Sequence, residues 1–85
     1  MKMKKVIDVS TGMVEAAKAG VILRSLAIGS CIVIAAYDLS KKVGAMAHIM
    51  LPGRAPKDAG VGRTRYAANA IDEMINRITI RGVSI

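Results

Sequence analysis

Two mostly apolar segments flank a short polar turn in the middle of this chain, and together they predict a β-hairpin. The first, Cys31 to Tyr37, is continuous and rich in β-branched residues, as expected for a strand that is buried on both faces. The second runs from Val43 to Leu51, and the residues between the two, Asp38 to Lys42, have turn chemistry. The fold must therefore hold two strands that are adjacent in the sequence.

Further strands are predicted before the hairpin. Lys5 to Val9 and Val21 to Ile28 have the composition of short strands. Met13 to Ala19 is ambiguous, because its alanines favour a helix whereas its shortness favours a second edge strand.

After the hairpin the apolar period changes. Pro52 to Arg63 carries both prolines and reads as a long loop. Apolar residues then recur at helical spacing, which predicts an amphipathic helix over 64–81, capped by Thr64 and ended at Gly82. Val83 to Ile85 looks like the opening of another strand. The periodic positions are Ala67, Ala70, Ile71, Met74, Ile75 and Ile78.

These elements predict an α/β fold. We expect a mixed sheet that contains at least the strands 21–28, 31–38 and 43–51, with the helix packed on one face. With 85 residues the chain forms a single domain, 1–85. One cysteine excludes both a disulfide framework and a zinc finger.

The chain has a formal net charge of +7, which favours an anionic partner. Its basic residues are dense only near the N-terminus and in the 54–65 loop, and no Phe or Trp is present to stack on bases, so we predict no nucleic-acid partner. The longest uncharged stretch, Ser25 to Tyr37, is too short to insert into a membrane. No secretory signal is evident, so a cytoplasmic location is expected.

The one cysteine and the one histidine can meet across the predicted hairpin. If the turn is centred between Ser40 and Lys41, His48 pairs with Val33. Cys31 then becomes a diagonal neighbour of His48, with Cα atoms roughly 7–8 Å apart. A register slip of one residue would place the two side chains on opposite faces. The pattern thus permits a Cys–His pair, and it equally permits a buried thiol beside a hydrogen-bonded core histidine.

Such a pair suits acyl transfer. A thiol becomes a strong nucleophile when a neighbouring imidazole takes its proton. Backbone N–H groups around Gly29, Ser30 and Cys31 are suited to an oxyanion hole, because glycine allows a tight turn.

The residues around this pair resemble a known family. Ala27–Ile34 reads AIGSCIVI, and Val43–Pro52 reads VGAMAHIMLP. This combination of a Gly-Ser-Cys turn with a Met-Ala-His segment resembles the CheD family of chemoreceptor glutamine deamidases. Arg65–Ile71 resembles the start of the family's helix, with Asn69 where an Asp is usual. The resemblance runs from about Val21 to Ile78.

The resemblance implies that Cys31 is the nucleophile and His48 the general base. Ser25 stands where the family has a Thr as its third active-site residue, and it keeps the hydroxyl that would orient the imidazole. The implied activity is hydrolysis of receptor glutamine side chains to glutamate with release of ammonia, without a metal or organic cofactor. The implied partners are methyl-accepting chemotaxis receptors and a CheC-type phosphatase.

The family's fold is a layered α/β sandwich. Because its members are considerably longer, the resemblance implies that this chain supplies the first half and that the C-terminal half is absent. The sheet would then expose an edge, through which the chain is expected to form homo-oligomers.

Two other functions stay open at this point. One is an inert CheD-like binding module that docks on the phosphatase or the receptor. The other, which the lack of Phe and Trp disfavours, is a small basic nucleic-acid binder.

Overall fold

The strand β5 (Val43–Ile49) lies at the centre of the fold, paired on both sides. The computed structural model describes residues 5–26, 29 and 31–83. In it, β5 pairs antiparallel with β2 (Val14–Lys18) along one edge and with β4 (Ile32–Asp38) along the other. The predicted hairpin is confirmed: Asp38 and Val43 close it, and the Asp38 carboxylate accepts a hydrogen bond of 2.9 Å from the Lys41 N–H.

Two strands near the N-terminus form a separate sheet. β1 (Lys5–Asp8) pairs parallel with β3 (Val21–Arg24). A 3-10 helix, η1 (Gly60–Arg65), and an α-helix, α1 (Ala67–Ile80), follow β5.

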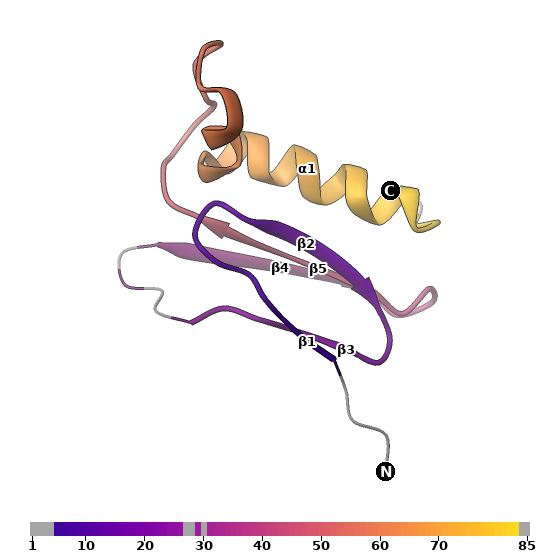
Figure 1. Ribbon diagram of the computed structural model, residues 1–85. Coiled ribbons are helices and arrows are strands. Elements are labelled where there is room, and N and C mark those ends of the chain that lie inside the picture. Colours follow the sequence, from indigo (N-terminus) through magenta and orange to yellow (C-terminus); the bar gives the residue numbers. More distant parts are fainter. Residues whose placement is uncertain (1–4, 27–28, 30, 84–85) are drawn as a thin grey trace.

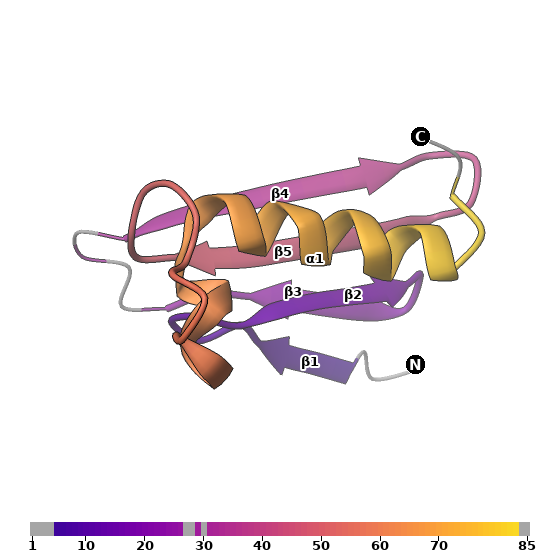
Figure 2. The same cartoon turned by 90° about the horizontal axis from the view of Figure 1, so that it is seen from above.

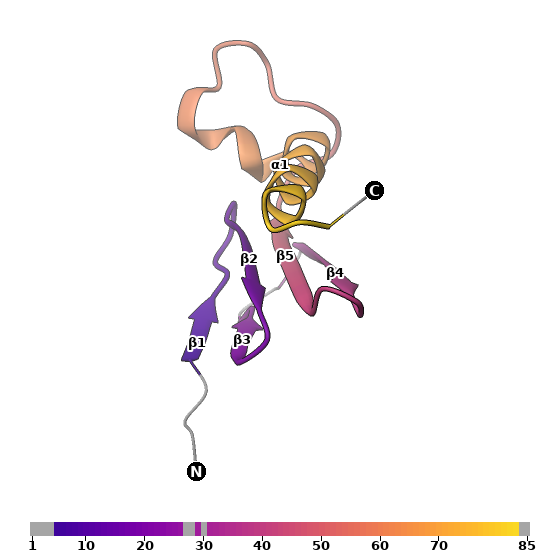
Figure 3. The same ribbon diagram turned by 90° about the vertical axis from the view of Figure 1, so that its right-hand side faces the viewer.

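These elements lie in layers. α1 covers one face of the β2–β5–β4 sheet, and the β1–β3 pair lies on the other side of that sheet (Figure 1). Seen from above, α1 lies alongside β5 and runs in the opposite direction (Figure 2). In the end-on view, the β1–β3 pair lies toward the β2 side, away from β4 (Figure 3).

The core sits between β5, β2 and α1. Alternate residues of a strand share one face, and four of the residues on the α1 side of β5 are buried. Ala70 and Met74 of α1 pack against them, one turn apart on the helix. The small side chains on the sheet allow the helix to lie close to it. The buried residues of β5 on this face are Val43, Ala45, Ala47 and Ile49.

The ambiguous segment Met13 to Ala19 forms a strand. Its residues 14 to 18 pair with 47 to 43 of β5, and Val14 and Ala16 enter the same core. Pairing with β5 therefore overrides the helical preference of the alanines.

The predicted helix is confirmed, but its predicted N-cap is wrong. α1 begins at Ala67 after Tyr66, which makes no side-chain capping bond. Thr64 instead lies in η1, which spans the end of the predicted loop and the first two residues of the predicted helix, and its hydroxyl donates to the Gly12 carbonyl at 2.5 Å. The predicted end is confirmed: Gly82 has φ +93°, and its N–H bonds the Thr79 carbonyl at 3.0 Å.

The predicted mixed sheet needs a correction. β3 does not join β4 and β5; it pairs with β1 in the parallel sheet. It also ends at Arg24, and the last predicted residues, 27–28, lie outside the described residues. The predicted strand at Val83 to Ile85 is also absent at Val83, and its other two residues lie outside the described residues.

The prediction that the 31–37 strand is buried on both faces is wrong. β4 is an edge strand of the described sheet, and Ile32 and Tyr37 are 64% and 61% exposed. An apolar composition shows that a strand can be buried, but the neighbouring elements decide whether it is.

The general α/β class is confirmed by five described strands and the α-helix. The family-type sandwich stays a prediction, as does the single domain 1–85. In the part of the chain that the structure describes, no helix is both long and apolar enough to cross a bilayer.

Two glycines with positive φ provide a matched test of the packing around the β1–β2 turn. Gly12 has φ +83° and Gly20 has φ +96°, so alanine is strained at both. A Cβ at Gly12 would also lie 2.8 Å from Arg65 Cγ, whereas nothing lies within 4 Å at Gly20. We predict that Gly20→Ala lowers the free energy of unfolding by about 1–2 kcal/mol and Gly12→Ala by about 2–3 kcal/mol, measured by urea denaturation. Equal losses would show that Arg65 moves aside without cost.

Candidate active site

The hairpin has the predicted register, and this register relates Cys31 to His48. His48 on β5 pairs with Val33 on β4, as predicted. Cys31 immediately precedes β4, two residues before Val33, so it occupies the diagonal position relative to His48. The structure thus brings the two residues to the same end of neighbouring strands.

His48 is held tightly. Its residue is 1% exposed, the one buried polar or charged residue found in the described chain. Its backbone N–H donates to the Met13 carbonyl at 3.1 Å, and its carbonyl accepts from the Gly12 N–H at 2.8 Å. Its ring Nδ1 lies 3.1 Å from the Val9 carbonyl oxygen. The segment between β1 and β2, residues 9–13, therefore fixes both the backbone and the ring of His48.

The contact with Val9 determines which ring nitrogen carries the proton. A carbonyl oxygen can only accept a hydrogen bond, so in the neutral imidazole Nδ1 is the donor and Nε2 is unprotonated. Nε2 is buried and has no hydrogen-bond partner among the described residues. The ring therefore presents a free lone pair, which is what a general base requires.

Ser25 contacts the same carbonyl rather than the ring. Its hydroxyl donates to the Val9 oxygen at 2.6 Å. No hydrogen bond from Ser25 to the imidazole occurs among those of the described residues. The third predicted residue is thus near His48 but is linked to it through Val9.

The parallel sheet positions both Val9 and Ser25. Arg24 and Asp8 face each other in register, and the Arg24 guanidinium donates to both Asp8 carboxylate oxygens, at 2.7 and 3.2 Å. The Val9 N–H donates to the Arg24 carbonyl at 2.6 Å. Val9 and Ser25 follow directly after this doubly bonded pair, so their positions are set by it.

The thiol environment is partly described. Cys31 is half-buried, and no hydrogen bond joins it to His48 among the described residues. Gly29 has φ +52°, a left-handed conformation that favours glycine and fits the expected tight turn. Ser30, the other residue expected near an oxyanion hole, lies outside the described residues.

A surface depression lies apart from this pair. The depression, of about 430 Å³, is on the His48 face of the sheet but toward the start of β5, and its lining includes Lys18, Tyr37 and Met46, not Cys31 or His48. It therefore has no part in the chemistry of the thiol and the imidazole. Among the described residues, no group of three or more His, Cys, Asp or Glu is arranged to hold a metal.

Sequence reasoning missed Val9. It contributes a backbone carbonyl, and a backbone group leaves no signal in residue types or spacing. A hint existed in the expected strand Lys5 to Val9, which ends just before the Ser10-Thr11-Gly12 turn that returns the chain to His48.

Comparison with known proteins finds several curated relatives that carry the same name. No family model matches the chain. A Chlorobium luteolum protein named probable chemoreceptor glutamine deamidase CheD is 47% identical over 66 residues, covering 78% of this chain and 33% of that protein. A Desulfitobacterium hafniense protein of the same name is 42% identical over 84 residues, covering 96% and 51%. The chemoreceptor glutamine deamidase CheD of Halalkalibacterium halodurans is 39% identical over 61 residues, covering 71% and 38%.

The fold and these residues define an α/β protein that carries a half-buried thiol and a buried imidazole on neighbouring strands. Over the length that it spans, the chain belongs to the CheD family, as the resemblance implied. The chain spans about half the length, or less, of these curated relatives.

The Asp8–Arg24 pair predicts a pH dependence of stability. The hydrogen bond from Arg24 lowers the pKa of the Asp8 carboxyl below its ordinary value. A lowered folded-state pKa stabilises the fold fully above the unfolded pKa of about 3.9, and this contribution is lost as the pH falls through the lowered value. We therefore expect Asp8→Asn to remove part of the decrease in unfolding free energy between about pH 4 and pH 2, measured by urea denaturation.

Arg24→Met provides the matched variant, because its side chain has no N–H and so removes the same hydrogen bonds from the other side. It is expected to flatten the same acid region, and the double variant should add nothing further. The effect will be small because both side chains are about half exposed. Acid curves of both variants that run parallel to wild type would contradict the prediction.

Proposed function

We propose that this chain carries the chemistry of a chemoreceptor glutamine deamidase, with Cys31 as nucleophile and His48 as general base. The reaction hydrolyses the side-chain amide of receptor glutamines to glutamate and releases ammonia. The names of its relatives support the reaction class, since they are called chemoreceptor glutamine deamidases.

The observation that carries the proposal is that the buried Nε2 of His48 has no hydrogen-bond partner among the described residues. Burying a polar atom without a hydrogen bond costs about 1–3 kcal/mol. In a small domain that is a large fraction of the total stability, so such an atom requires an explanation. A catalytic base accounts for it, because its lone pair must be free to take a proton from the thiol or from a substrate.

The proposed steps follow from these two groups. His48 Nε2 accepts the Cys31 thiol proton, and the thiolate sulfur attacks the amide carbon to give a tetrahedral oxyanion. His48 returns the proton to the amide nitrogen, the C–N bond breaks, ammonia leaves and a thioester remains. Water, deprotonated by Nε2, then attacks the thioester carbon, and the C–S bond breaks to give glutamate and the free thiol.

The surrounding residues have supporting roles in this scheme. The amides of the 29–31 turn would donate to the oxyanion, as expected from the sequence. Ser25 keeps the position of the imidazole, acting near the ring rather than on the substrate. The scheme uses no metal and no organic cofactor.

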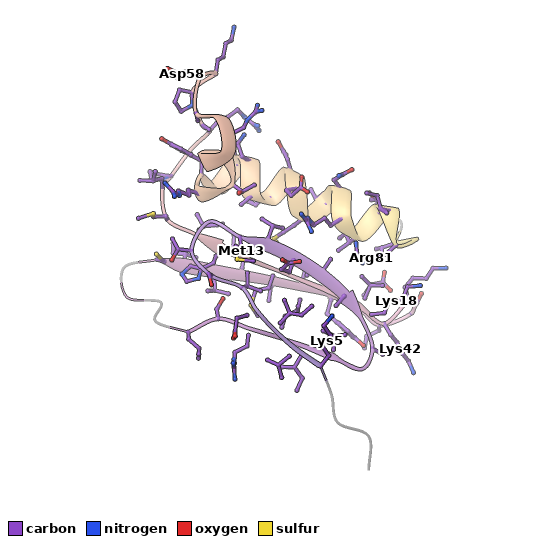
Figure 4. All side chains as sticks on the ribbon, viewed as in Figure 1. Lys5, Met13, Lys18, Lys42, Asp58 and Arg81 are labelled. Carbon is purple, nitrogen blue, oxygen red and sulfur yellow. The ribbon has the colours of Figure 1, made fainter. Side chains whose placement is uncertain are left out.

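The proposed partners are acidic surfaces of methyl-accepting receptors and a CheC-type phosphatase, met in the cytoplasm. The 54–65 loop supports this part of the proposal with four exposed cations, of which Arg54 is paired with Asp72 and the others are Lys57, Arg63 and Arg65. The loop lies near the site, because the Arg65 carbonyl accepts from the Met50 N–H, two residues after His48. A second basic group lies elsewhere: Lys5, Lys18, Lys42 and Arg81 gather at the end of the molecule away from Met13 (Figure 4). The loop is therefore the cationic surface nearer the site.

The central test is deamidation of receptor peptides by the chain. Wild type is expected to add about one dalton per modified glutamine and to release ammonia, whereas Cys31→Ala removes the nucleophile and should reduce the rate by at least about a thousandfold. Mass spectrometry and an ammonia assay measure both products. If wild type and Cys31→Ala convert the peptides equally, Cys31 is not the nucleophile. If wild type is inactive yet binds the phosphatase, the chain is a binding module.

Alkylation of Cys31 tests the dyad without any receptor. We predict that Cys31 reacts with iodoacetamide at pH 7 faster than the cysteine of an unstructured peptide, because His48 Nε2 promotes formation of the thiolate. His48→Ala should abolish that advantage. Circular dichroism checks that the variant keeps its fold. A slow Cys31 in the wild-type chain would mean that the thiol is a buried, inert side chain and would contradict the proposal.

A further inference from the structure

We infer that the backbone carbonyl of Val9 is the third member of this site, fixing the tautomer of His48, and that Ser25 is a positioning residue that acts through this carbonyl. The inference rests on the proposed function for its chemical purpose. Its structural part, the state of the imidazole, can be tested independently of any activity.

The geometry of the carbonyl is the first argument. Two donors converge on the Val9 oxygen: the His48 ring Nδ1 at 3.1 Å and the Ser25 hydroxyl at 2.6 Å. A carbonyl has two lone pairs, so both bonds can form at once. Val9 is 0% exposed and His48 is 1% exposed, which keeps bulk water from competing for the oxygen.

The rigidity of the carbonyl is the second argument. The Val9 N–H is bonded to the Arg24 carbonyl at 2.6 Å, and the next turn returns to the backbone of His48 through Gly12 and Met13. Val9 and His48 are therefore joined twice, once through the ring and once through the backbone. A ring held in this way cannot rotate about its Cβ–Cγ bond without breaking the contact with Val9.

The chemical consequence concerns Nε2. A free neutral histidine favours the tautomer with the proton on Nε2, in which that nitrogen cannot act as a base. The Val9 carbonyl selects the opposite tautomer, because it can bond only a protonated Nδ1. The unpartnered Nε2 is then left with its lone pair available to the Cys31 thiol.

The role of Ser25 follows. Its hydroxyl donates to the oxygen rather than to the ring, so it holds the acceptor in place and leaves the His48 bond intact. Ser25→Ala should therefore lower the alkylation rate of Cys31 only about two- to fivefold, a range typical of a weak neutral hydrogen bond. Ser25→Thr keeps the hydroxyl and should restore the wild-type rate. A residue that bonded the ring directly would have a larger effect, at least about tenfold, and would change the tautomer.

The first experiment is ¹⁵N NMR of the imidazole in the full chain. We expect the Nδ1–H tautomer, with Nε2 showing the chemical shift of an unprotonated ring nitrogen. The same spectrum of Ser25→Ala should keep this tautomer. An Nε2–H tautomer in the wild-type chain would overturn the inference, whatever the reactivity of Cys31.

The second experiment weakens the carbonyl itself. The chain is short enough for chemical synthesis, and replacing the Val9–Ser10 amide by an ester makes the Val9 carbonyl a poorer acceptor. The ester also replaces the Ser10 N–H by an oxygen, but that N–H donates none of the hydrogen bonds found among the described residues, so no hydrogen bond is lost with it. We expect a loss of Nδ1–H tautomer and a fall in the Cys31 alkylation rate of about two- to tenfold. Circular dichroism and the NMR spectrum report whether the fold persists.

The matched control is the same ester at the Lys57–Asp58 linkage, where no hydrogen bond is found at either group in the described residues. It should leave both the tautomer and the rate unchanged. If both esters act alike, or if the Val9–Ser10 ester changes neither measurement, the carbonyl does not position His48. If the tautomer is as expected but Cys31 is unreactive in the wild type, the positioning holds and the proposed function fails.

Discussion

The hydrogen bond from His48 Nδ1 to the Val9 carbonyl is the interaction on which the arrangement of this molecule depends. It joins the small parallel sheet to β5, the central strand of the larger sheet. Two strands alone are rarely stable in water, so the β1–β3 pair needs such attachments. The β1–β3 pair also places the buried Val9 carbonyl oxygen beside the imidazole, and the hairpin itself provides no such acceptor.

The balance of energies around His48 explains why a histidine occupies this place. One ring nitrogen gains a hydrogen bond in a buried environment, and the other has no partner among the described residues, at a cost of about 1–3 kcal/mol. An apolar residue of similar size would avoid that cost. Retaining the imidazole is therefore better explained by chemistry than by stability, and the half-buried Cys31 at the diagonal position is the group that this chemistry would serve.

Much of the hairpin could be predicted from the sequence, because local features define it. The turn residues Asp38 to Lys42 set the register, and the register sets which residue faces His48. The end of α1 was equally predictable, since only glycine readily adopts the positive φ at position 82. In both cases the deciding interactions lie within a few residues along the chain.

The other features of the fold and of the site depend on contacts between residues that are distant in the sequence. The strand at 14–18 exists because β5 pairs with it. β4 is exposed because, among the described strands, it pairs with β5 alone. The partner of β3 turned out to be β1, which no apolar pattern distinguishes from β4. The acceptor of the His48 proton is a backbone oxygen 39 residues away, and residue types carry no information about it.

The claim that His48 is a tethered base beside a thiol is tested most directly by a high-resolution crystal structure of the unmodified chain. We predict that Nδ1 stays bonded to the Val9 oxygen and that no group other than the Cys31 thiol can approach Nε2. An ordered Cys31 side chain that points away from the imidazole, with Nε2 bonded to another group, would contradict it.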